Sequence, residues 1–136
     1  MGAWGMGIFD NDTACDWAYS LEESNDLSVV EDAIETVLSV DSDYLEAPDA
    51  EEALAACEVI ARLRGNFGDR NSYTETVDNW VSGNSLKVPR ELIEKAKAAI
   101  ARIISDSSEL AELWTESGDY EEWKHNIDNL LSRIGT

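Results

Sequence analysis

Apolar residues recur at spacings of three and four positions along almost the whole chain, and no segment shows the strict alternation of a half-buried strand. A period near 3.6 residues places apolar side chains on one face of an α-helix, and other helices must cover that face. Seven segments show this pattern, separated by short stretches rich in turn residues. The pattern predicts an all-α fold: a single domain over residues 1–136, built as an irregular or orthogonal bundle of about six to seven helices.

Capping residues and turn residues indicate where these helices begin and end. Three segments have clear bounds, at residues 11–23, 50–64 and 73–81. Three pairs of residues have the spacing of a capping box, in which two side chains satisfy each other's backbone N–H groups: Ser28 with Glu31, Asp49 with Glu52, and Asp106 with Glu109. Pro89 suits the first position of a further helix, and Gly135 follows the last one.

Acidic residues dominate the charge of the chain. Twenty-nine Asp and Glu residues face ten Lys and Arg residues, which gives a formal net charge of −19, and residues 1–61 contain sixteen acids and no Lys or Arg. Such a field repels nucleic-acid phosphates and anionic membranes and attracts basic proteins. No run of 18 apolar residues is present, so no membrane span is expected. An acidic surface that serves solubility alone is the other interpretation of this charge.

One loop and the helix after it combine acids with apolar side chains. A basic partner is expected to bind there, because Tyr44 and Leu45 can act as apolar anchors among the charges. The candidate partner-binding residues are Asp41, Asp43, Tyr44, Glu46, Asp49, Glu51 and Glu52. A solvated loop with helix-capping residues explains the same composition equally well.

The stretch GAWGMGIFDND, residues 2–12, places three glycines beside aromatic and acidic residues. It lacks the lysine and the preceding strand of a phosphate-binding loop. We expect an ordered N-terminal arm in which Trp4 fills the bundle and Asp10 caps the first helix, with Phe9 packing on Ala14 as a hydrophobic staple. The residues assigned to this structural motif are Gly2, Trp4, Gly5, Gly7, Phe9, Asp10, Asn11, Asp12, Asp16 and Trp17.

Residues for catalysis or for a metal site are scarce. His125 is the only histidine, which leaves too few ligands for zinc and no partner for a hydrolytic triad, so it is expected to be a solvent-exposed residue near the middle of a helix. Neither Asp10 nor Asp41 begins a complete calcium-binding loop. We therefore expect no cofactor, no metal ion and no catalytic residues. Cys15 and Cys57 are expected to be free thiols, as in a reducing cytoplasm.

The order of residues from Gly2 to Trp17, G-x-W-G-x-G-x-F-D-N-D-x-A-x-D-W, resembles a bacterial family known only as domain of unknown function 4259. Further similarities are YLEAP at residues 44–48 and SELAELW at residues 108–114, so the resemblance extends over essentially the whole chain. It implies a small intracellular bacterial protein. It brings no catalytic residue, cofactor or activity.

Three functional hypotheses follow. The first is a non-enzymatic protein-binding module, such as an immunity or antitoxin-like protein that neutralises a basic nuclease toxin in the cytoplasm. The second is an enzyme that binds a small molecule or metal in a carboxylate-lined pocket between helices. The third is a homo-oligomeric structural module in which the basic helix near residue 95 meets the acidic half of another copy; the sequence leaves the oligomeric state open.

Overall fold

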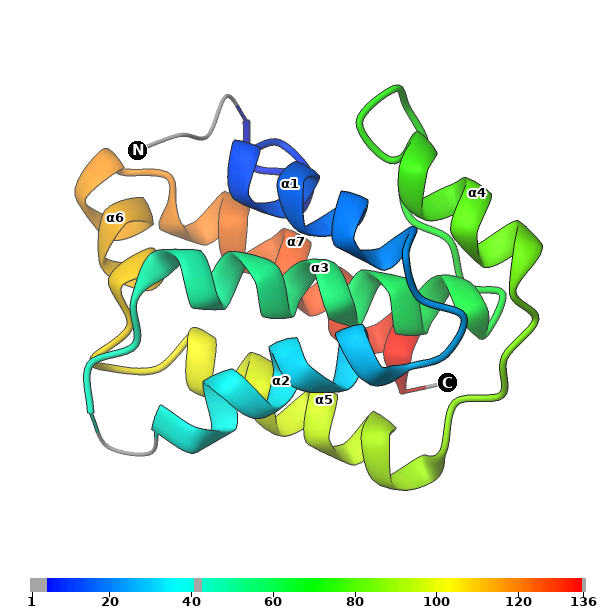
Figure 1. Cartoon of the computed structure of the whole chain (residues 1–136). Helices are drawn as coiled ribbons and strands as arrows, with labels where there is room; N and C mark the ends of the chain where they lie inside the picture. The colour runs from blue at the N-terminus through cyan, green and yellow to red at the C-terminus, as the bar shows by residue number, and fades with distance from the viewer. Residues whose placement is uncertain (1–4, 41–42, 136) are drawn as a thin grey trace.

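The computed structural model describes residues 5–40 and 43–135, and within these ranges it contains seven α-helices and no β-strand. In chain order the helices are α1 (Asp12–Leu21), α2 (Ser28–Val40), α3 (Ala47–Leu63), α4 (Glu75–Gly83), α5 (Arg90–Ile103), α6 (Glu109–Ser117) and α7 (Tyr120–Ile134). The prediction of an irregular all-α bundle is confirmed (Figure 1). No helix in the described part of the chain is both long and apolar enough to cross a membrane.

Helix α3 is the centre of the bundle and contacts all six other helices (Figure 1). Helix α6 lies beside its N-terminal end, and α4 packs near its C-terminal end. Every residue from 53 to 62 is buried. The apolar spacing predicts five inward residues here, and all five are buried, but the residues between them are buried as well; the five are Ala53, Leu54, Cys57, Ile60 and Ala61.

The composition of α3 explains the burial of residues 53–62. Six of its residues are alanines, whose small side chains let neighbouring helices approach from every side. A helix surrounded in this way has no solvent-facing side on which to place charges. Glu58 and Arg62 are therefore each only 2% exposed, although the apolar pattern does not mark them as core residues.

Tryptophans fill much of the rest of the core, as their helical spacing predicts. Trp17, Trp80, Trp114 and Trp123 are all at most 7% exposed. The rings of Trp114 and Trp123 stack with their centroids 6.5 Å apart. The indole N–H of Trp80 donates to the carbonyl of Ser24 at 2.8 Å, which satisfies the one polar group that the ring buries. Both cysteines are free thiols, as predicted.

The cap of α1 differs from its prediction by one residue. Asn11, not Asp10, is the N-cap: its side-chain oxygen accepts the backbone N–H of Ala14 at 2.7 Å. The Asn11 amide also donates to the carbonyl of Ile8 at 3.3 Å, so one side chain joins the arm to the helix. An amide can make both bonds because it carries a donor and an acceptor, whereas an ionised aspartate can only accept.

The capping boxes predicted for α2, α3 and α6 are also absent. At α2, the backbone N–H of Glu31 donates to the carbonyl of Leu27 at 2.8 Å and not to the Ser28 hydroxyl, which itself donates to Asp26. Helix α3 begins at residue 47, before Pro48, and its N-cap makes no side-chain bond. The N-cap of α6 is Ser108, which also makes no side-chain cap bond.

Candidate functional site

The loop before α3 is fastened to the start of α6. The backbone N–H of Leu45 donates to the carbonyl of Ser107, and the N–H of Glu109 donates to the carbonyl of Leu45, each at 2.8 Å. The carboxylate of Glu109 accepts the N–H of Ala47 at 2.8 Å, so a residue of α6 caps α3. Arg102 donates to the carbonyl of Asp43 on the same loop. These bonds join two segments about sixty residues apart in the chain.

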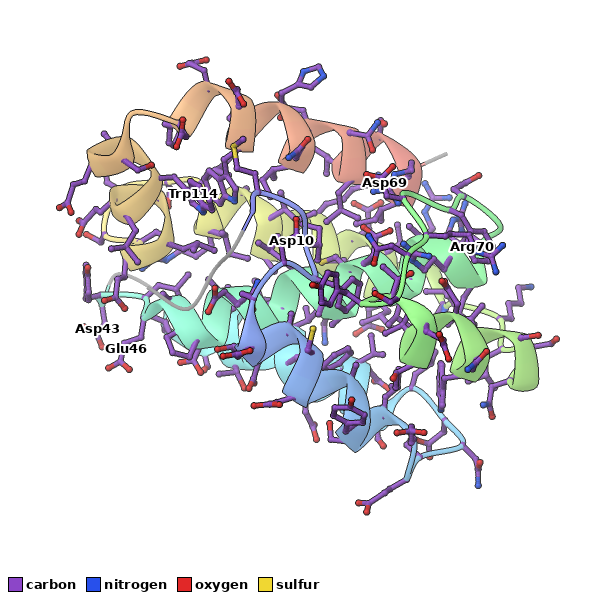
Figure 2. All side chains as sticks on the ribbon, turned by 90° about the horizontal axis from the view of Figure 1, so that it is seen from above. Asp10, Asp43, Glu46, Asp69, Arg70 and Trp114 are labelled. Carbon is purple, nitrogen blue, oxygen red and sulfur yellow. The ribbon has the colours of Figure 1, made fainter. Side chains whose placement is uncertain are left out.

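This junction brings acids from both segments to one end of the molecule. We call this surface the acidic end; it consists of Asp43, Tyr44, Glu46, Glu109, Glu112 and Glu116. Asp43 and Glu46 lie in solvent there (Figure 2). The ring of Tyr44 is 50% exposed, and its hydroxyl donates to Glu112 at 2.8 Å. That bond, strengthened by the negative charges of α6, raises the pKa of Tyr44 to about 12.

The predicted partner-binding residues fall into different surroundings. Asp43, Tyr44 and Glu46 belong to the acidic end. Asp49 and Glu52 are half-buried, and Glu51 is only 9% exposed. Asp41 lies outside the described residues. Sequence patterns do not identify the glutamates of α6 as part of this surface, because only the tertiary contact between residues 45 and 108 places them beside Tyr44.

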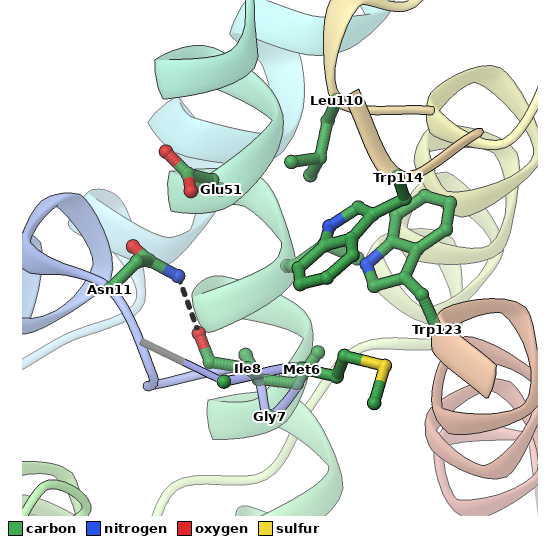
Figure 3. A pocket seen from close by; sticks show the side chains of 10 residues that line it. Met6, Gly7, Ile8, Asn11, Glu51, Leu110, Trp114 and Trp123 are labelled. Carbon is green, nitrogen blue, oxygen red and sulfur yellow. Dashed lines mark hydrogen bonds between the residues drawn. The ribbon is translucent and has the colours of Figure 1, made fainter. Parts of the chain in front are cut away.

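Glu51 faces a small cavity instead of the acidic end. Figure 3 shows this cavity between the N-terminal arm, the start of α6 and the stacked rings of Trp114 and Trp123. Its volume is about 20 Å³, enough for a single water molecule. Burial raises the pKa of Glu51. The cavity is too small to accept a substrate.

In the N-terminal arm, residues 5–11, the carboxylate of Asp10 leaves no room for a side chain at Gly5 or Gly7. A Cβ atom on Gly5 or Gly7 would lie 2.6 or 2.7 Å from a carboxylate oxygen of Asp10. That oxygen accepts the backbone N–H of Gly7 at 3.0 Å, and the N–H of Asp10 donates back to the carbonyl of Gly7 at 3.1 Å. Phe9 is buried at 3% exposure, but with Asn11 as the N-cap it is not at the N′ position that the predicted hydrophobic staple requires. Gly2 and Trp4 lie outside the described residues.

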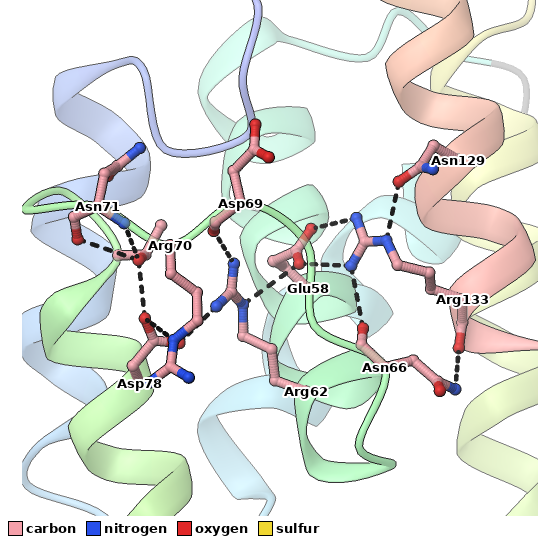
Figure 4. Close-up of polar contacts among 10 residues, drawn as sticks. Glu58, Arg62, Asn66, Asp69, Arg70, Asn71, Asp78, Asn129 and Arg133 are labelled. Carbon is pink, nitrogen blue, oxygen red and sulfur yellow. Dashed lines mark hydrogen bonds and ion pairs between the residues drawn. The ribbon is translucent and has the colours of Figure 1, made fainter.

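At the other end of α3, buried charges of opposite sign are paired (Figure 4). Glu58 accepts two bonds from Arg133 of α7, at 2.6 and 3.0 Å, and lies 3.2 Å from Arg62 Nε. Arg62 also binds Asp78 of α4 and donates to the carbonyl of Asp69 at 2.6 Å. Buried charges need such partners, because desolvation is otherwise far more costly than the folding energy of a small domain allows.

A polar cleft of about 690 Å³ opens above these ions. The N-terminal arm, the loop of residues 67–74 and α7 form its walls, and α3 contributes Glu58 and Arg62. Asp10 and Asp69 lie on this face of the molecule, and Asp69 is at the end opposite Asp43 (Figure 2). The side chain of Asn126 joins α7 to the arm by donating to the carbonyl of Met6 at 3.3 Å. The sequence suggests a carboxylate-lined pocket between helices only as one hypothesis and assigns no residues to it.

The residues considered for metal chemistry form no cluster of ligands in the part of the chain that the structure describes. His125 is exposed, as predicted, at the rim of the cleft. Within residues 5–40 and 43–135, no group of three His, Cys, Asp or Glu residues is arranged to hold a metal ion. Two acids of the N-terminal motif, Asp12 and Asp16, are exposed on α1.

A comparison with family models matches residues 2–126 to the family described as Domain of unknown function (DUF4259). No curated protein and no solved structure matches the chain.

Proposed function

We propose that this chain, which belongs to the Domain of unknown function (DUF4259) family, is a protein-binding module whose acidic end binds a basic surface of a partner protein. The observation that carries the proposal is that α6 adds three glutamates to the predicted loop around a half-exposed tyrosine. A one-sign patch around an aromatic side chain favours fast, electrostatically steered binding to a basic protein.

The rigidity of the acidic end supports the same function. The loop is held to residues 107–109, at the start of α6, by three bonds of 2.8 Å, and the Tyr44 ring is oriented by Glu112. A surface that is ordered before binding loses less conformational entropy when the partner docks. A basic nuclease toxin in the cytoplasm is the kind of partner that this chemistry fits, which makes the chain an immunity or antitoxin-like protein.

The bases of α5 give less support to the oligomer hypothesis. Lys95 pairs with Glu35 at 2.7 Å and with Glu91 at 3.5 Å, and Lys97 pairs with Glu94 at 3.8 Å. These bases already have acidic partners within the chain. A second copy would have to compete with those pairs.

Site-specific photo-cross-linking tests the proposal. A photoreactive phenylalanine analogue replaces Tyr44 in one variant and Tyr19, which is 61% exposed on α1, in the matched control. In the native cytoplasm we expect the probe at position 44, and not the one at position 19, to capture a basic protein. The absence of any such product, or equal capture from both positions, contradicts the proposal.

Charge variants then test the captured partner in purified form. Glu46→Gln, Glu112→Gln and Glu116→Gln together remove three charges from the acidic end, whereas Glu22→Gln, Glu23→Gln and Glu31→Gln remove three exposed charges elsewhere. The first triple variant should weaken binding at low salt by at least about tenfold, and the second by much less. Equal losses would mean that only the net charge matters.

A further inference from the structure

Two guanidinium groups line the polar cleft, and both are bonded to other groups of the protein. Arg133 donates to Glu58, to the side chain of Asn129 at 2.8 Å and to the carbonyl of Asn66 at 3.2 Å. Arg62 is 2% exposed and donates to Asp78 and to the carbonyl of Asp69. The positive charges in the cleft are therefore engaged by the protein itself.

Hydrogen-bond acceptors from three elements remain open in the same cleft. The carboxylate of Asp69 has no partner among the described residues, and Figure 4 shows it pointing away from Arg62 and Arg133. Asp10 uses one carboxylate oxygen for Gly7, and its second oxygen has no hydrogen-bond partner within the described chain. The Asn126 amide is oriented by its bond to Met6, which leaves its Oδ1 atom as an acceptor.

We propose that the polar cleft binds a small organic cation that carries N–H donors, namely an aliphatic amine or guanidinium compound. Its charged head donates to Asp69, Asp10 and Asn126 in charge-assisted bonds. Met6, Ile8 and Phe67 also line the cleft and provide apolar contacts for the aliphatic chain. A volume of about 690 Å³ lies within the range of small-molecule sites, and the net charge of −19 concentrates cations around the protein.

Two other ligand classes fit the cleft less well. An anion would find both guanidinium groups already paired with carboxylates and would be repelled by the field of the whole chain. A quaternary ammonium ion needs aromatic faces instead of acceptors. The ring of Phe67 already has Arg62 and Arg70 at 5.4 and 5.0 Å from its centroid.

Titration with agmatine, which carries both an amine and a guanidinium group, tests the proposal. Calorimetry and amide NMR shifts are measured at moderate salt, with tetramethylammonium as a cation that has no N–H donor. We expect saturable binding of agmatine, with shifts confined to the arm, to the loop of residues 67–74 and to α7. Equal binding of tetramethylammonium, or shifts spread over the acidic surface, overturns the proposal, as does an absence of binding.

Two substitutions of equal charge locate the binding site. Asp69→Asn should weaken agmatine binding by about tenfold or more, the usual effect of losing a hydrogen bond to a charged group. Glu112→Gln, at the acidic end, should leave agmatine binding unchanged. Equal effects of both substitutions would contradict a site in the cleft. The inference does not rest on the proposed protein-binding function, because the cleft and the acidic end are different surfaces. Agmatine binding can therefore fail or succeed independently of partner binding.

Discussion

At the acidic end Asp43, Glu46, Glu112 and Glu116 lie in solvent without a paired base among the described residues, whereas at the C-terminal end of α3 Glu58 and Arg62 are buried and paired. The exposed acids of the first end retain their hydration, so their charge is available to a partner. The buried ions of the second end have exchanged water for one another, so they hold α3, α4 and α7 together. The same residue types thus form the proposed binding surface in one place and hold helices together in the other.

The substitution expected to change stability most is Glu58→Ala, at the buried end of α3. It leaves Arg62 and Arg133 without their shared carboxylate in a buried site, and we expect a loss of about 3–5 kcal/mol in the free energy of unfolding. Denaturation in urea measures it. The matched control is Asp128→Ala, which removes the exposed partner of Lys124 and should cost less than about 1 kcal/mol. Similar losses of unfolding free energy in the two variants would show that the buried ion pairs stabilise the fold no more than an exposed pair does.

The origin of this contrast explains what the sequence can and cannot predict. Spacing along the chain reports which face of a helix is apolar, and it correctly predicts the helical class and the buried tryptophans. It does not report how many neighbours a helix has. The burial of Glu58 depends on Arg133, 75 residues away, and no local pattern contains that information.

The acidic end also depends on a tertiary contact that local sequence patterns cannot predict. Its loop is recognisable from composition, because Tyr44 and Glu46 lie among other acids. The contribution of α6 depends on the bridge between Leu45 and Ser108. Local rules also misplace the first helix cap by one residue, since Asp10 and Asn11 both favour that position. The hydrogen bonds to Gly7 and Ala14 distinguish the two.

A second test concerns the arm that walls the cleft. In Gly7→Ala the new Cβ would lie 2.7 Å from the Asp10 carboxylate, which must move and give up its bond to the residue-7 N–H. We expect a loss of about 1–2 kcal/mol in unfolding free energy. In an Asp10→Ala background the same substitution should cost much less, as a double-mutant cycle would measure. Additive costs would show that Asp10 does not impose the glycine.

A third test separates structure from binding within the acidic end. Glu109→Ala removes the carboxylate that accepts the N–H of Ala47 and so caps α3, which should lower the unfolding free energy by about 1 kcal/mol. Glu109→Gln keeps an acceptor oxygen and should restore most of that loss, as thermal or urea denaturation can show. A full loss in the glutamine variant would mean that charge, and not the hydrogen bond, stabilises this helix end.

The smallest expected change in stability is that of Glu112→Gln, because its carboxylate is exposed and bonds only the Tyr44 hydroxyl. The unfolding free energy at neutral pH should stay within about 0.5 kcal/mol of the parent value.

The pKa of Tyr44 reports its bond to Glu112 more sensitively than the unfolding free energy does. Because the folded-state pKa of Tyr44 is raised, the contribution of Tyr44 to the free energy of unfolding is fully present below pH 10. It is lost as the pH rises from 10 towards about 12. Ultraviolet titration of the parent should therefore show one phenol ionising near pH 12, absent in Tyr44→Phe and moved towards pH 10 in Glu112→Gln. An unchanged titration in Glu112→Gln would show that Glu112 does not hold the ring, and the ordered tyrosine would then no longer distinguish the acidic end from the other exposed acids of the chain.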